Sequence, residues 1–170
     1  MLQRIQTYYL GIIIVIQIIA VSGMDFIRFY SEKFIYVLNA WGVSVERNPE
    51  WKKILPSEFS PADEVVPKGY MIPVFIGFIS LTLLAFLCIM SYKNLDRQLK
   101  LGRTLFYLYF VSVVSVYLMA TLGSSWIDEK ITSQEVGLPY WVFICGLPLA
   151  FLANTGIKRD KRILDSLKRL

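Results

Sequence analysis

The spacing of charged side chains constrains this chain more than any other feature of its sequence. Asp, Glu, Lys and Arg make up 18% of its 170 residues, yet they leave four long intervals that contain none of them. These intervals hold twenty, twenty-four, twenty-four and twenty-two residues, and they lie between Arg4 and Asp25, Lys68 and Lys93, Arg103 and Asp128, and Glu135 and Lys158. A helix that crosses about 30 Å of hydrocarbon at about 1.5 Å per residue needs about 20 such residues. Each interval therefore allows one crossing, and none allows two.

The composition also indicates a membrane protein. A hydrophobic content of 55%, an aromatic content of 15% and a mean hydropathy of +0.51 are too apolar for a soluble domain of this length. We therefore predict an all-α membrane protein whose single domain, residues 1–170, is a four-transmembrane-helix bundle. The predicted spans cover about residues 5–24, 70–92, 104–127 and 137–157, and a 45-residue outer loop, residues 25–69, joins the first two spans.

The first interval also resembles a secretory signal peptide. A basic start and an apolar run precede the small residues Ala20, Val21 and Ser22, as at a cleavage site. The apolar core is longer than the usual length of about 7 to 15 residues, so we expect the segment to be kept as a membrane anchor.

The distribution of charge between the two sides predicts the orientation. With four spans, both termini and the link at residues 93–103 share one side, which carries eleven basic and three acidic residues and a net charge of +8. The other side carries seven basic and ten acidic residues and a net charge of −3. Because Lys and Arg near helix ends resist translocation, we expect a multi-pass membrane protein with both termini in the cytoplasm.

The tail at residues 158–170 has an amphipathic basic pattern. At about 100° per residue, Ile163, Leu164, Leu167 and Leu170 fall within one arc of about 120°, and basic residues gather on the other side. One interpretation is a contact surface for anionic lipid or a partner subunit, and the other is a topology signal followed by a solvated helical end. The candidate contact residues are Lys158, Arg159, Lys161, Arg162, Leu164, Leu167, Lys168 and Arg169.

Inside the spans, a few small and polar residues predict helix packing. Gly146, Ala150 and Asn154 recur every four residues on the fourth span, which favours close helix contacts. The amides of Gln17 and Asn154 are expected to join helices by hydrogen bonds. Together with Tyr109 and Tyr117 they are also the candidates for lining a polar groove between the spans.

Two interpretations are open for the start of the outer loop. The segment KFIYVLNAWGVSVERN places β-favouring residues around a turn at Asn39 to Gly42, which predicts a small hairpin. The alternative for residues 25–38 is an interfacial helical extension of the first span through Phe26, Phe29 and Tyr30.

The absence of several residue types narrows the chemistry. The chain has no histidine, which excludes His-ligated haem, His-containing metal sites and Ser-His-Asp catalysis within it. No span contains Asp, Glu, Lys or Arg, which disfavours a proton-driven carrier. Outer acids form two adjacent pairs, Asp63 with Glu64 and Asp128 with Glu129, but no metal-ligand spacing or nucleophile motif accompanies them. We expect no catalytic, cofactor-binding or metal-binding residues and no enzymatic activity.

Both ends of the chain resemble a known family. The start MLQRIQTYYL and the end LANTGIKRDKRILDSLKRL are similar to the signature ends of a four-span inner-membrane protein family of Bacteroidota, catalogued as a domain of unknown function. The matching residues are Gln3, Arg4, Ile5, Gln6, Ala153, Asn154, Ile157, Lys158, Asp160, Leu167 and Arg169. The outer loop has no match, and Lys161 stands where the family pattern has an acidic residue. The resemblance implies a tetraspan fold in the cytoplasmic membrane and brings no activity or catalytic residues.

Two functional hypotheses follow. The first is a non-enzymatic accessory or assembly subunit of a larger inner-membrane complex, with protein translocation or insertion machinery and respiratory machinery as candidate hosts. Its partners would be membrane lipids and other integral membrane subunits, with ribosome or nucleic acid contact only indirectly, in translocation machinery. The second is a small lipid- or solute-handling membrane protein that acts through a groove between helices.

Overall fold

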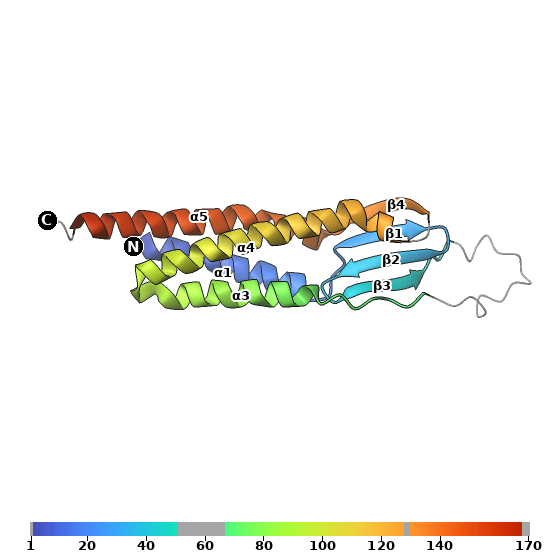
Figure 1. Ribbon diagram of the computed structural model, residues 1–170, viewed down its shortest axis with the longest axis horizontal. Coiled ribbons are helices and arrows are strands. Elements are labelled where there is room, and N and C mark those ends of the chain that lie inside the picture. Colours follow the sequence, from blue (N-terminus) through green and yellow to red (C-terminus); the bar gives the residue numbers. More distant parts are fainter. Residues whose placement is uncertain (1, 51–66, 128–129, 168–170) are drawn as a thin grey trace, which may run out of the picture.

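The protein is an elongated bundle of helices with a β-sheet at one end (Figure 1). The structure, a computed structural model, describes residues 2–50, 67–127 and 130–167. The helices are α1 (Leu2–Val21), α3 (Val74–Met90), α4 (Leu95–Leu122) and α5 (Leu138–Leu167), with short 3-10 helices η1 (Ser91–Lys93) and η2 (Gly123–Trp126). The strands are β1 (Ile27–Ser31), β2 (Phe34–Asn39), β3 (Gly42–Arg47) and β4 (Ile131–Val136). Both termini and the turn between α3 and α4 lie at the end of the bundle opposite the sheet.

The all-α prediction is therefore wrong, because the protein combines helices with an antiparallel sheet of strand order β3-β2-β1-β4. Three strands come from residues 25–69, the segment expected to be an outer loop, and β4 comes from the link between the third and fourth predicted spans. Within the expected loop, residues 27–47 are folded because their backbone N–H and C=O groups pair with one another and with β4 in the sheet.

The hairpin of β2 and β3 is confirmed, and the helical extension of the first span over residues 25–38 is wrong. Asn39 pairs with Gly42 across the turn, and the Asn39 side-chain oxygen accepts hydrogen bonds from the backbone N–H groups of Trp41 (2.9 Å) and Gly42 (3.1 Å). Gly42 has a φ of +141°, which favours glycine. A Cβ atom there would also lie 2.8 Å from the backbone nitrogen of Ile72, so this position has no room for a side chain.

Strand β4 joins the sheet beside β1, and this pairing continues the packing of the two terminal helices. Ile27 pairs with Val136 and Tyr30 with Ser133. β1 follows α1 after a short connection and β4 precedes α5, and α1 and α5 pack against each other. We call this antiparallel contact of residues 2–31 with residues 131–167 the terminal seam. It runs from the end of the bundle opposite the sheet to the sheet itself (Figure 1).

The centre of the bundle is filled by aromatic rings. Tyr109 stacks on Phe143 with ring centroids 5.0 Å apart, and its hydroxyl donates a hydrogen bond of 2.9 Å to the Phe143 carbonyl oxygen. Phe143 meets Phe78 edge-on at 5.1 Å, and Phe78 stacks on Phe26 at 5.6 Å. Such pairs contribute about 0.5–1.5 kcal/mol each beyond their burial, so this cluster holds α3, α4 and α5 to the start of the sheet.

The outward surface of the helices is apolar. Within the described residues, three helices are long and apolar enough to cross a membrane, and they cover Val74–Lys93, Leu95–Trp126 and Leu138–Leu167. The apolar stretch of α1, Ile5–Val21, is shorter and packs beside α3 and α5. The large apolar side chains exposed on the helices include Ile12, Val15, Ile18, Ile79, Leu83, Phe86, Val111, Leu118 and Phe151. An apolar surface of this extent is stable against lipid and not against water.

The close approach of α5 to Tyr109 can be tested with two glycines. A Cβ atom at Gly146 would lie 2.6 Å from Tyr109 Cζ, whereas one at Gly77 would have no neighbour within 4 Å. We expect Gly146→Ala to lower the free energy of unfolding by about 1–3 kcal/mol, because the Tyr109 ring must shift from its stacked position. Gly77→Ala should instead raise it by about 0.5–1 kcal/mol, because alanine favours helix. Unfolding of the purified protein in detergent measures both, and equal effects of the two variants would contradict this account of the packing.

Candidate functional site

A pocket lies where the sheet meets the bundle, and the apolar face of the sheet forms one wall. Side chains alternate between the two faces of a strand. Phe29 pairs with Tyr36, and Tyr36 pairs with Val45, so these three side chains share a face. Leu38 and Val43, which pair with each other, lie on the same face. This face is apolar apart from the tyrosine hydroxyl.

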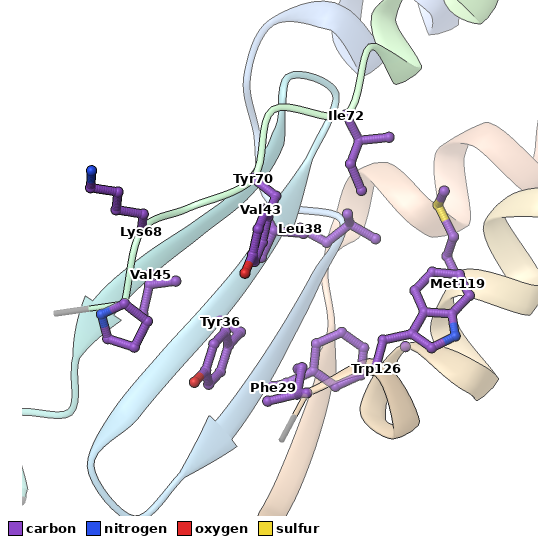
Figure 2. A pocket seen from close by; sticks show the side chains of 13 residues that line it. Phe29, Tyr36, Leu38, Val43, Val45, Lys68, Tyr70, Ile72, Met119 and Trp126 are labelled. Carbon is purple, nitrogen blue, oxygen red and sulfur yellow. The ribbon is translucent and has the colours of Figure 1, made fainter. Parts of the chain in front are cut away.

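The opposite wall comes from two other parts of the chain. The segment at residues 67–72 runs beside β3, where the Val43 N–H donates a hydrogen bond of 2.8 Å to the Tyr70 carbonyl oxygen. The end of α4 and η2 supply Met119 and Trp126. Together the walls enclose a cavity of about 340 Å³, which we call the sheet pocket (Figure 2). Ligand pockets typically measure about 300–1,000 Å³, so this one is large enough to bind a small molecule or one chain of a larger one.

The sheet pocket is apolar and has a single charge at its rim. Among its described lining residues only Lys68 is charged. Lys68 is exposed, and in Figure 2 its side chain extends away from the apolar walls near Val45. Such a pocket suits a ligand with an apolar body and an anionic group.

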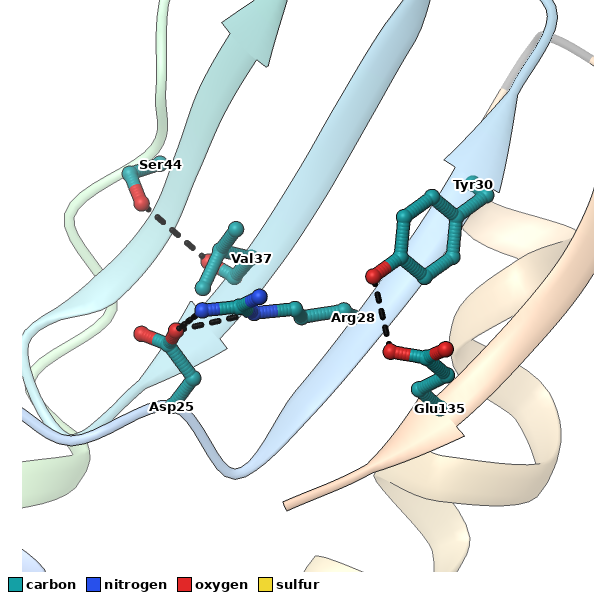
Figure 3. Close-up of polar contacts among 6 residues, drawn as sticks. All are labelled: Asp25, Arg28, Tyr30, Val37, Ser44 and Glu135. Atoms are coloured by element: carbon teal, nitrogen blue, oxygen red, sulfur yellow. Dashed lines mark hydrogen bonds and ion pairs between the residues drawn. The ribbon is translucent and has the colours of Figure 1, made fainter. Parts of the chain in front are cut away.

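The other face of the sheet carries polar and charged groups beside Ile35 and Val37, and two hydrogen-bonded pairs lie on it (Figure 3). Arg28 Nε donates a hydrogen bond of 2.9 Å to Asp25, and this bond raises the pKa of the Arg28 guanidinium. The Tyr30 hydroxyl donates a hydrogen bond of 2.7 Å to Glu135, which raises the pKa of the Tyr30 phenol. Because Arg28 and Glu135 are exposed and each has a hydrogen-bond partner, we assign these two pairs to the solvent-facing surface. The outer acids Asp63, Glu64, Asp128 and Glu129 lie outside the described residues.

The basic tail is not a separate helix. α5 continues as one helix of 30 residues from Leu138 to Leu167, so the tail extends the fourth predicted span. Lys161 forms an ion pair with Asp96 at the start of α4, and this contact raises the pKa of the Lys161 ammonium. Residues 162–167 are exposed, and α5 projects beyond the other helices at this end (Figure 1).

The predicted tail residues differ in how they are placed. Lys158, Arg159 and Arg162 are exposed, whereas Lys161 is half-buried and tied to Asp96. Leu164 and Leu167 are 41% and 61% exposed on the projecting part of α5. Lys168 and Arg169 lie outside the described residues. An apolar stripe with basic neighbours is therefore exposed at the end of the bundle opposite the sheet.

The residues predicted for helix packing lie between helices. Gly146 and Ala150 are buried on α5, and Asn154 Oδ1 lies 3.4 Å from the position of a Cβ atom built on Gly102 of α4. Gln17 is fully buried and lines an apolar groove between α1 and α3.

The four candidates for a polar groove between helices do not meet in one cavity. Gln17 lines the groove between α1 and α3, and its side chain also lies beside the hydroxyl of Tyr109, which is buried in the aromatic core and lines none of the cavities described here. Tyr117 is 55% exposed, and Asn154 lies against α4.

Two functional features were missed from the sequence. One is the buried carboxylate of Asp160, which accepts a hydrogen bond of 2.6 Å from Gln6 Nε2 across 154 residues of chain. Gln6 and Asp160 both lie in the two ends of the chain that resemble the family, and this resemblance was the sequence signal that could have indicated their contact. The other is the sheet pocket, whose walls contain Phe29 and Tyr36. Their period-two alternation was the available signal, but Lys68 could be joined to them only through the fold.

Comparison with known proteins agrees with the resemblance of the two ends. A family profile described as "Domain of unknown function (DUF4293)" matches residues 2–170. No curated protein and no solved structure matches the chain. Because the match covers almost the whole sequence, including both helical ends and the sheet between them, the chain belongs to the DUF4293 family.

Proposed function

We propose that this protein is a non-enzymatic accessory or assembly subunit of a larger inner-membrane complex, and that its α5 tail docks a partner subunit. The observation that best supports the proposal is the course of α5, which runs without interruption from the bundle into the tail. A helix that binds a bilayer surface lies in the plane of that surface. A tail that continues the bundle axis leads away from the bilayer instead, into the surrounding water.

The exposed side chains of the tail favour a protein partner. Ile163, Leu164 and Leu167 are 40%, 41% and 61% exposed, and they follow one another along one side of the helix. Amphipathic helices of this kind bind in apolar grooves through anchors spaced by three or four residues. Arg159 and Arg162 add positive charge beside the stripe, so the partner groove should be rimmed by acidic groups.

The charge distribution supports a cytoplasmic position for the tail. The tail side of the bundle has a net charge of +8 and the sheet side has a net charge of −3, as expected when the basic side stays in the cytoplasm. In this arrangement all four helices cross the membrane and the sheet stands on the outer side. Lys158, which is exposed and lies near the end of the apolar part of α5, would contact anionic headgroups. Candidate hosts are protein translocation or insertion machinery and respiratory machinery.

The orientation can be tested by cysteine labelling. In a background with Cys88→Ala and Cys145→Ala, we expect Ser133→Cys on β4 to react with a membrane-impermeant maleimide in intact spheroplasts. Ser166→Cys on the tail should react only after lysis, because the bilayer would separate it from the reagent. The background protein without cysteine is the control. Labelling of Ser166→Cys in intact spheroplasts would contradict the proposed topology.

The docking role of the tail can be tested by placing a charge on its apolar stripe. Burying a leucine at an interface contributes about 1.5–3 kcal/mol, so Leu164→Glu and Leu167→Glu should each weaken partner binding about tenfold or more. Size-exclusion chromatography in mild detergent should show the wild-type protein in a larger species of fixed stoichiometry and the variants at the size of the free protein.

Ser166→Glu is the matched control, because it adds the same charge at an exposed neighbouring position. It should elute with the wild type. A wild-type protein that elutes alone, or stripe variants that stay in the larger species, would refute docking through the tail.

A further inference from the structure

An apolar groove on the outward surface of the helices lies next to the sheet pocket. This groove of about 290 Å³ lies between α3 and α4, and its lining residues include Gly77, Ser112 and Ser115. Ile72 and Met119 line both the groove and the sheet pocket, so the two cavities meet at these side chains. The Ser112 and Ser115 hydroxyls donate to carbonyl oxygens one turn earlier in α4, at 2.8 and 2.9 Å, and so need no other partner. The small side chains that line the groove therefore offer no unsatisfied hydroxyl group to a hydrocarbon chain.

The groove and the sheet pocket together form a track for a ligand. Its lining is apolar near the bundle and carries a charge at the end farther from the bundle. Tyr70 is bridged to Val43 near the bundle end of the sheet. Ile72 lies two residues from Tyr70 on the side toward α3, and Lys68 lies two residues from it on the other side. Figure 2 shows Ile72 and Met119 at one end of the pocket and Lys68 at the other. A molecule in this track would have its apolar part toward the membrane and its anionic part outside.

The size of the pocket limits its ligand to one hydrocarbon chain. A water molecule occupies about 30 Å³ in the liquid, and a methylene group is of similar size, so a cavity of about 340 Å³ holds on the order of ten carbon atoms. We propose that the sheet pocket binds one acyl chain of an anionic phospholipid that is lifted partway out of the leaflet at the sheet end. The remainder of the chain lies in the groove between α3 and α4, and the phosphate contacts the Lys68 ammonium.

The bilayer is the source of this ligand because the groove opens onto the lipid-facing surface of the bundle. A chain that moves from lipid into the groove and pocket exchanges one apolar environment for another, so little apolar surface is exposed to water. Selection among lipids then depends on the headgroup. Trp126 lines the pocket and is 65% exposed, and tryptophan favours the headgroup level of a bilayer.

The binding test uses the full-length protein in detergent with defined lipids. Phosphatidylglycerol and phosphatidylcholine with identical chains are each added at low concentration, and retained lipid is counted by mass spectrometry after gel filtration. We expect about one phosphatidylglycerol per protein and about tenfold less phosphatidylcholine, because only the anionic lipid gains a charge-assisted contact with Lys68. Equal retention of the two lipids would overturn the headgroup assignment.

Three variants locate the contact. Lys68→Glu should reduce phosphatidylglycerol retention about tenfold or more, whereas Lys130→Glu, an equal charge change at an exposed position that does not line the pocket, should leave it unchanged. Val43→Trp fills the pocket and should abolish retention of both lipids. Equal effects of the two lysine variants overturn the contact with Lys68, and wild-type retention by Val43→Trp overturns the pocket itself. Because Lys68 and Lys130 are exposed, the lysine pair remains informative even if Val43→Trp does not fold.

Discussion

The terminal seam is the contact on which the rest of the structure depends. At the end away from the sheet the buried carboxylate of Asp160 accepts a hydrogen bond from Gln6, and at the sheet the Tyr30 hydroxyl donates to Glu135. A buried carboxylate is costly unless it is hydrogen-bonded, so the Asp160 contact fixes the register of α1 against α5. Once these helices lie antiparallel, the strands that continue them lie side by side and pair. The sheet is thus an extension of the helix packing.

Charge spacing predicted the positions of the helices well because lipid excludes charged side chains and irregular backbone alike. It did not predict their lengths. α4 begins at Leu95, where the Asn94 side chain accepts a hydrogen bond from the Arg97 N–H, and so it includes charged residues that were expected in the inner link. α5 likewise continues through the basic tail to Leu167. α4 and α5 thus extend beyond their uncharged intervals, whereas α3 ends within its interval.

The sheet was only partly predictable, and its strands differ in the signal they carry. β2 and β3 have β-favouring residues around the turn at Asn39 and Gly42, so their hairpin could be predicted from the local sequence. In β4 every residue except Ile131 is exposed, so its sequence ITSQEV shows no apolar alternation. Its partner β1 lies about a hundred residues earlier, and no local pattern reports such a pairing. The sheet pocket could not be predicted from the sequence for the same reason, because it forms only when the fold brings β1 and η2 together.

The position of the sheet also explains why a pocket exists there. A sheet with one apolar face normally buries it against a layer of helices. Here the strands continue along the bundle axis, so the helices meet the end of the sheet and do not cover its face (Figure 1). In the described part of the chain, the apolar side chains of Phe29, Tyr36 and Leu38 are covered by residues 67–72 and by η2. These two short segments cannot fill the space that a packed helix would occupy, and the space they leave opens toward Ile72 and Met119, where the lipid-facing groove begins.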